Sequence, residues 1–164
     1  MTISTPDLSD NFPEETQIVY PVLGQPFRHF GAKTEFFGEI VTIRCPNDNS
    51  LVAEQVKTPG KGRVLVVDGN ASMQCSLLGD QLAAAAIENA WSGILINGCL
   101  RDVELIAAMP IGIMALASVP KKTVKRGMGE LDVVLQFANA QFTPGHYLYA
   151  DQTGIITAAR SLLS

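Results

Sequence analysis

The chain has 164 residues, a formal net charge of −4, and a composition that is 47% hydrophobic and 17% charged. This length suits one domain with its own core, so we expect a single α/β domain over residues 1–164. The negative charge argues against nucleic acid as a partner, because a general nucleic-acid binder needs a basic face. The charged fraction lies below the roughly 25% usual for soluble domains, and this favours an oligomer that buries apolar surface between subunits.

The N-terminal segments give no sign of a targeting sequence or a membrane anchor. Residues 1–15 are polar and acidic, unlike a secretory signal. Thr5 is the expected cap of a short helix that has Pro6 at its first position. Residues 19–31 mix prolines and glycines with large apolar side chains, which predicts an irregular packed arm.

The middle of the chain alternates strand and helix signals. Apolar, β-branched runs that close at turn residues predict strands at 36–45, 62–69, 94–97 and 111–118. Segments rich in helix formers and bounded by Gly or Pro predict helices at 49–57, 79–91 and 101–109. This βαβαβ order predicts a parallel sheet with right-handed crossovers and with helices outside. The longest apolar stretch, 106–119, is interrupted by Pro110 and is too short to span a membrane.

The last part of the chain changes to short strands with tight turns. Strands are expected at 132–138, 140–142, 147–150 and 154–157, followed by a helical turn at 158–163. These C-terminal β-hairpins should form a second sheet packed on the first. The expected fold is therefore a three-layer arrangement with helices outside, built around the central βαβαβ unit.

The three cysteines show no metal-ligand spacing and lie in or beside apolar segments; they are Cys45, Cys75 and Cys99. This pattern indicates reduced, buried thiols in a cytoplasmic protein. The one basic cluster lies between a proline and a glycine and consists of Lys121, Lys122, Lys125 and Arg126. Such a run is typical of a solvated loop, and a position flanking a site is the alternative.

The most informative spacing separates Asp80 from the dipeptide Arg101-Asp102 by twenty residues. Each end follows a predicted parallel strand and opens a helix, so both should lie at the sheet edge where α/β proteins bind ligands. A helix start offers free N–H groups to an anion, a guanidinium binds an oxyanion, and a carboxylate holds a hard cation. Simpler explanations stay open, since either aspartate can cap its own helix and the arginine can be a surface residue.

Other catalytic chemistries have less support. A zinc site needs His and Cys ligands, whereas His29 and His146 lie far apart and suit packing or surface positions. No G-x-S-x-G, P-loop or G-x-G-x-x-G motif is present, and all six lysines lie in polar or turn-like segments that do not suit a Schiff base. An oxygen-bound metal remains. Magnesium takes one or two carboxylates and keeps several waters, and one ligand from Asp102 with waters positioned by Asp80 would suit it.

Six segments are similar to motifs of one known protein family. They are FRHFG at 27–31, GRVLVVDG at 62–69, LGD at 78–80, GCLRD at 98–102, IGI at 111–113 and PGHYLYAD at 144–151. In these segments the chain resembles the family that joins the regulator of ribonuclease E activity A (RraA) to the 4-hydroxy-4-methyl-2-oxoglutarate aldolases. The resemblance spans nearly the whole chain. It implies the β/β/α swivelling-domain fold and a ring-shaped homotrimer with sites near subunit interfaces.

The resemblance also implies a lyase. Aldolases of the family split 4-hydroxy-4-methyl-2-oxoglutarate into two pyruvates and decarboxylate oxaloacetate, using Mg²⁺ or Mn²⁺. By motif, Arg101 would contact the pyruvate-like oxygens and act in catalysis with Asp80, while Asp102 would bind the metal. The backbone amides that would bind the substrate belong to Gly79, Asp80, Gln81 and Leu82.

The family also contains regulators, which gives a second hypothesis: a non-catalytic protein that binds and inhibits ribonuclease E. Regulatory members tend to lose the complete Asp-Arg-Asp set, which is intact here. Longer aldolases carry a C-terminal extension that contributes to a neighbouring site, and a chain ending at Ser164 is not expected to supply it. Relatives labelled as methyltransferases of menaquinone synthesis are a third branch, for which this sequence has no nucleotide-binding glycine motif.

Overall fold

A computed structural model describes residues 2–163. Within them the helices are α1 (Thr5–Asn11), α2 (Ser50–Gln55), α3 (Asp80–Glu88) and α4 (Val103–Ala107). The strands are β1 (Thr16–Val19), β2 (Arg28–His29), β3 (Phe36–Arg44), β4 (Val64–Asp68), β5 (Gly93–Leu100), β6 (Gly112–Ser118), β7 (Glu130–Leu131), β8 (Leu135–Phe137), β9 (Ala140–Phe142), β10 (Tyr147–Ala150) and β11 (Ile155–Ala158).

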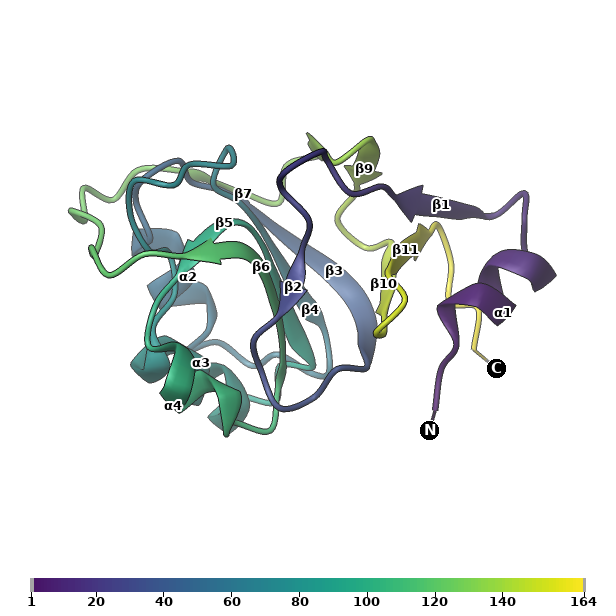
Figure 1. Ribbon diagram of the computed structural model, residues 1–164, viewed down its shortest axis with the longest axis horizontal. Coiled ribbons are helices and arrows are strands. Elements are labelled where there is room, and N and C mark those ends of the chain that lie inside the picture. The colour runs from purple at the N-terminus through teal and green to yellow at the C-terminus, as the bar shows by residue number, and fades with distance from the viewer. Residues whose placement is uncertain (1, 164) are drawn as a thin grey trace.

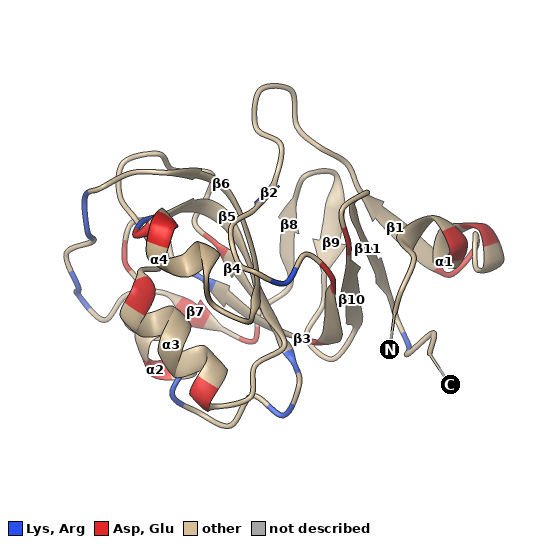
Figure 2. Cartoon of the chain, turned by 60° about the horizontal axis from the view of Figure 1, so that its bottom comes forward, with Lys and Arg blue, Asp and Glu red and all other residues tan. Residues whose placement is uncertain are grey.

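The central layer is a parallel sheet in the order β3-β4-β5-β6. Helices α2, α3 and α4 gather on one face of it (Figure 1). Because this sheet is covered on both faces, its strands are continuous apolar runs rather than alternating ones. The chain ends lie at one end of the molecule, and the loop between β6 and β7 lies at the opposite end (Figures 1 and 2).

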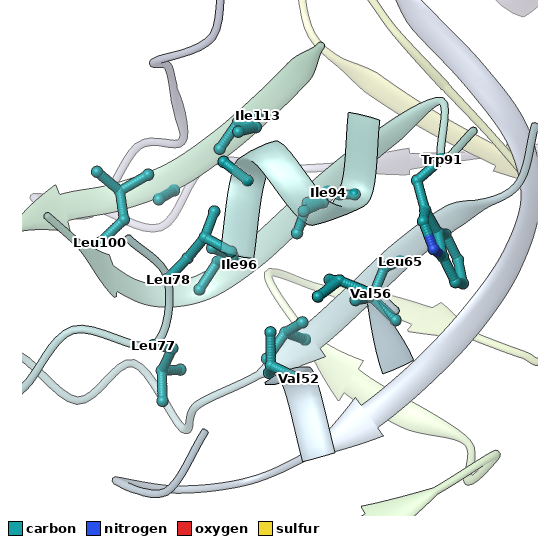
Figure 3. Close-up of a cluster of buried hydrophobic side chains, with 14 of the residues drawn as sticks. Val52, Val56, Leu65, Leu77, Leu78, Trp91, Ile94, Ile96, Leu100 and Ile113 are labelled. Carbon is teal, nitrogen blue, oxygen red and sulfur yellow. The ribbon is translucent and has the colours of Figure 1, made fainter. Parts of the chain in front are cut away.

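The core beneath the helices fixes how closely they approach the sheet. Helix α3 turns Ala83 and Ala86 inward, and both are fully buried. These small side chains let the helix lie close over the strands. Larger side chains of the cluster include Val52, Val56, Leu65, Leu77, Leu78, Trp91, Ile94, Ile96, Leu100 and Ile113 (Figure 3).

Strand β3 belongs to two layers. Its first half, Phe36–Glu39, pairs with β10, and its second half, Ile40–Arg44, pairs with β4. β10 continues to β11 and β1, and these strands stand beside the central sheet in Figure 1. A second core lies between the layers, with Val66 and Leu95 from the central sheet and Phe142 and Leu148 from the C-terminal strands. The three-layer β/β/α expectation is confirmed.

The C-terminal strands differ in detail from the expectation. Only β8 and β9 form a separate two-stranded sheet, because β10 and β11 join the large sheet through β3. The expected helical turn at 158–163 is wrong: β11 runs to Ala158, and the backbone N–H of Leu162 then donates to the Tyr149 hydroxyl at 2.8 Å. The expected strand at 132–138 is shorter and begins at Leu135.

The N-terminal segments also differ. Ser4, not Thr5, caps α1 by accepting the N–H of Asp7, and the Thr5 hydroxyl instead donates to Asp151 at 2.7 Å. The arm expected to be irregular contains β2, which pairs antiparallel with β6. The three cysteines are free and buried, as expected. Among residues 2–163 no helix has the length and apolar character that crossing a bilayer requires.

Candidate active site

Three backbone hydrogen bonds bring distant segments to one sheet edge. The segment before α3 lies between the end of β5 and the loop after β6. On one side, Leu77 N–H donates to Cys99 O at 2.9 Å and Arg101 N–H donates to Leu78 O at 2.9 Å. On the other side, Ser76 N–H donates to Lys121 O at 2.7 Å. The start of α3, the end of β5 and the loop between β6 and β7 therefore meet; this loop, residues 119–129, carries the basic cluster and is called the basic loop below.

The two aspartates of the spacing motif are joined across helices. The N-cap of α3 is Gly79, and Asp80 is the first helical residue. The N–H of Asp80 donates to Oδ2 of Asp102 at 3.0 Å, whereas Asp102 makes no side-chain cap on α4. Neither aspartate therefore caps its own helix, which was the simpler explanation that the sequence left open. Asp102 instead stabilises the start of the neighbouring helix.

Asp102 is held as a carboxylate. The backbone N–H of Asp80 lowers its pKa most strongly; partial burial opposes this, and the Asp80 side chain and the charge of Arg101 lower it further. Its backbone is left-handed, with φ 61° and ψ 43°, which is uncommon outside glycine but tolerated by Asp and Asn. Because this conformation is not that of a right-handed helix, α4 begins only at Val103, and the helix expected at 101–109 spans only Val103–Ala107.

Gly79 leaves the space that the aspartate and arginine side chains share. A Cβ at this position would lie 2.8 Å from Asp102 Oδ2 and 3.6 Å from Arg101 Nε. The backbone of Gly79 is ordinary extended chain, with φ −126°, so glycine is needed here for room. The guanidinium of Arg101 lies 3.4 Å from the carbonyl oxygen of Pro120, to which it donates.

A cavity of about 570 Å³ opens at this edge. The structure brings all the predicted site residues to its wall together with residues of the basic loop; the lining is Asn49, Ser76, Leu78, Gly79, Asp80, Gln81, Leu82, Arg101, Asp102, Lys122, Thr123, Val124 and Lys125. The basic cluster thus flanks the cavity, and the solvated-loop interpretation is incomplete.

The oxygen donors of the cavity suit the divalent cation that the resemblance implies only in part. Within residues 2–163 no three His, Cys, Asp or Glu side chains converge, so a site built wholly from such side chains does not fit. Two neighbouring carboxylates, Asp80 and Asp102, do fit Mg²⁺ or Mn²⁺, since magnesium commonly takes one or two carboxylates and completes its shell with water and substrate oxygens. The carboxylate of Asp102 offers the cation an oxygen besides the one bonded to Asp80.

Sequence reasoning missed the residues that lock the cavity wall. The Thr123 hydroxyl donates to Asn49 Oδ1 at 2.6 Å, and Asn49 Nδ2 donates to Leu77 O at 3.2 Å. Asn49 stands at the start of α2 but makes no side-chain cap. The only sequence signal was a capping-type residue at a predicted helix start, which does not show that its amide points elsewhere.

Asp48 anchors the basic loop. It is 4% exposed; Oδ1 accepts both the N–H and the hydroxyl of Ser50, and Oδ2 accepts the N–H groups of Arg126 and Met128. Burial raises the pKa of this carboxyl, but the hydrogen bonds from Ser50, Met128 and Arg126 outweigh burial and lower the pKa to about 2. The loop is therefore fixed to the α2 side of the cavity.

Asp48→Asn should lower the free energy of unfolding at pH 7 by about 2 kcal/mol, because the new amide turns N–H groups toward backbone donors. The folded pKa lies below the unfolded value near 4, so this stabilisation is present above pH 4 and is lost as the pH falls toward 2. Urea unfolding at pH 7 and pH 3 measures both effects. Asp10→Asn, on the exposed face of α1, is the control, and equal stability of the two variants would contradict the prediction.

Fold and site together define an α/β protein with a cavity lined by carboxylates and basic side chains at the carboxyl edge of a parallel sheet. The comparisons with known proteins narrow this class. Residues 5–157 match the RraA-like family, described as Aldolase/RraA. The chain belongs to this family.

Curated relatives match over nearly their full lengths. A protein of Xanthomonas campestris pv. campestris named "Putative 4-hydroxy-4-methyl-2-oxoglutarate aldolase" is 51% identical over 162 residues, which cover 99% of this chain and 95% of the relative. A protein of the same name from Ectopseudomonas mendocina is 52% identical over 158 residues, covering 96% of this chain and 95% of the relative.

Solved structures share the fold. One is described as an S-adenosylmethionine:2-dimethylmenaquinone methyltransferase from Geobacillus kaustophilus; it has a TM-score of 0.92 and 44% identity, with 98% of each chain covered. The other is described as the RNA-processing inhibitor RraA from Thermus thermophilis, with a TM-score of 0.92, 39% identity, and 99% and 98% of the two chains covered. Similar folds in this family thus carry different names.

Proposed function

We propose that this chain is a divalent-metal-dependent lyase that cleaves 4-hydroxy-4-methyl-2-oxoglutarate into two pyruvates and also decarboxylates oxaloacetate. The observation that carries the proposal is the convergence of Asp80, Arg101 and Asp102 on one cavity beside the start of α3. The names of the curated relatives support the aldol cleavage. The proposed setting is the cytoplasm.

Substrate binding uses the start of α3 and Arg101. The N–H of Asp80 is committed to Asp102, which leaves those of Gly79, Gln81 and Leu82 to hold the 2-oxo acid carboxylate at the positive end of the helix. Arg101 donates to the ketone and carboxylate oxygens of the same end. The substrate is thereby oriented with its C3–C4 bond in the cavity.

Cleavage moves an electron pair from the C3–C4 bond into the C2 ketone and forms a pyruvate enolate. Arg101 stabilises the negative charge that develops on the enolate oxygen. A water oriented by Asp80 takes the proton of the 4-hydroxyl, so that C4 becomes the ketone of the second pyruvate. The enolate takes up a proton at C3 to complete the first pyruvate. A divalent cation held by Asp102 would supply Lewis-acid stabilisation of the same charge.

Oxaloacetate uses the same enolate. Its C3–C4 bond breaks with loss of carbon dioxide, and the electron pair again enters the C2 ketone. No proton has to leave a hydroxyl in this reaction. The base role of Asp80 is therefore specific to the aldol substrate, whereas Arg101 serves both reactions.

A pyruvate assay coupled to lactate dehydrogenase tests the proposal with Mg²⁺ or Mn²⁺ present. We expect two pyruvates per aldol substrate and one per oxaloacetate. Absence of pyruvate from both substrates would refute the lyase.

A homotrimer is part of the proposal. Association of subunits is supported by the low charged fraction and by exposed apolar side chains on the arm before β2, namely Tyr20, Val22 and Leu23. The number of three subunits is taken from the family resemblance. Light scattering during size-exclusion chromatography measures the mass directly. A monomer at assay concentrations would contradict this part of the proposal.

The second candidate is a regulator that binds ribonuclease E without catalysis. The Thermus RraA structure and the exposed basic loop favour it. Protein that releases no pyruvate from any 2-oxo acid with metal, yet captures and inhibits the ribonuclease, would establish this function. Pyruvate release together with inhibition would mean that the chain does both.

A further inference from the structure

The loop after β6 gives the cavity a cationic wall opposite the start of α3. Lys122 and Lys125 line the cavity together with Arg101. The opposing charges in the lining are the carboxylates of Asp80 and Asp102. If these carboxylates hold a divalent cation, as the proposed function requires, the three basic side chains remain available to a negatively charged ligand.

The lysines are held at the cavity by a fixed backbone. The N–H of Ser76 donates to Lys121 O, Thr123 is 7% exposed and bonds to Asn49, and the backbone of Arg126 bonds to the buried Asp48. These contacts bracket both lysines along the chain. A backbone held at these points keeps two ammonium groups beside the cavity at a reduced cost in loop entropy.

Neither Lys122 nor Lys125 forms an ion pair within the described chain. Within residues 2–163 the ion pairs join Arg44 to Glu130 and Arg160 to Glu15, and neither involves the basic loop. Figure 2 shows the loop between β6 and β7 projecting at the end of the molecule far from both termini. Two unpaired ammonium groups beside a cavity form a site for a compact anion.

We propose that Lys122 and Lys125 are specificity-determining residues that bind the second carboxylate of the substrate, at C5, and so select dicarboxylic over monocarboxylic 2-oxo acids. This inference rests on the proposed function for the placement of the first carboxylate at α3 and Arg101. The cavity then has two anion subsites, one at the helix start and one at the loop. In the aldol reaction the loop subsite holds the pyruvate that leaves as the ketone.

Binding of two uncleavable ligands tests the inference without catalysis. 2-Oxoglutarate and 2-oxopentanoate have the same carbon skeleton and differ by a carboxylate in place of a methyl group at C5. In titration calorimetry with Mg²⁺, the wild type should bind 2-oxoglutarate at least about 10-fold more tightly, from two ion pairs of modest strength. This preference should shrink as salt is raised.

The variants assign the preference to particular side chains. Lys122→Ala/Lys125→Ala should reduce it to within about 3-fold, and Lys122→Arg/Lys125→Arg should retain it, since arginine also binds carboxylates. Lys121→Ala removes the same charge from the same loop but lies outside the cavity lining, so it should retain the preference. A wild type without the preference, no binding of either ligand, or equal loss in the Lys121 variant would each overturn the inference.

Kinetics separates this inference from the proposed function. The double alanine variant should lose about 10-fold in kcat/KM for the aldol substrate, mainly through KM, and little for 4-hydroxy-4-methyl-2-oxopentanoate, which lacks the C5 carboxylate. If no 2-oxo acid is cleaved but the binding preference is found, the lyase is refuted and the dicarboxylate site stands. If cleavage occurs without any preference, the dicarboxylate site alone is refuted.

Discussion

Asp102→Asn is expected to reduce pyruvate formation from the aldol substrate by at least about 10³-fold. The substitution keeps the size of the side chain, and asparagine tolerates the left-handed backbone found there. Its amide oxygen can still accept the N–H of Asp80, so the start of α3 should remain intact. What is lost is the negative charge that would hold a divalent cation, and with it the stabilisation of the enolate.

The measurement is kcat/KM in the coupled assay over a series of Mg²⁺ concentrations. Wild-type activity should disappear with EDTA and return with Mg²⁺ or Mn²⁺, whereas the variant should stay inactive throughout. Asp132→Asn is a matched control, because Asp132 is also left-handed, with φ 55°, but is exposed and outside the cavity lining. Full activity in the Asp102 variant would show that Asp102 is not the metal ligand.

Gly79→Ala is expected to lower kcat/KM by about 10²-fold with little change in stability. The added methyl group would lie 2.8 Å from Asp102 Oδ2, so the carboxylate or the neighbouring Arg101 must move. Displacement of a catalytic group by about 1 Å can lower the reaction rate by about 10²-fold. Because the backbone of Gly79 is extended, alanine adopts it without strain, and thermal unfolding should shift by less than about 3 °C.

Gly154→Ala is the control for this variant, since a Cβ there meets no atom within 4 Å. Both variants are compared by thermal unfolding and by the coupled assay. An active Gly79→Ala enzyme would show that the side chains of Asp102 and Arg101 tolerate displacement. A strongly destabilised one would show that Gly79 serves the fold instead of the cavity.

The layers of the fold were predictable from local patterns. Continuous apolar runs such as residues 64–67 of β4 are typical of a sheet buried on both faces, and the crossover helices follow from alanine-rich segments such as α3. The division of β3 between two layers was not predictable. Its nine residues read as one strand, and only contacts with β4 and β10, distant in sequence, divide them.

The candidate site was likewise only partly predictable from the sequence. The spacing of Asp80 and Arg101-Asp102, with the rule that parallel strands present their carboxyl ends together, was sufficient to predict that these residues share an edge. The sequence could not distinguish a helix cap from a cross-helix contact, because an aspartate at a helix start looks the same in both cases. The structure shows the N–H of Asp80 donating to Asp102.

Local sequence patterns were enough to give the residue types of the chemistry, the order of the central strands and helices, and the six segments that resemble the RraA-like family. Only the tertiary structure brought the basic loop to the cavity, through the buried Asp48 and the contact between Ser76 and Lys121. The two differ in the range of the interactions involved. An apolar period is visible among residues close together in the chain, whereas the Arg126 N–H donates to Asp48 across a sequence separation of 78 residues.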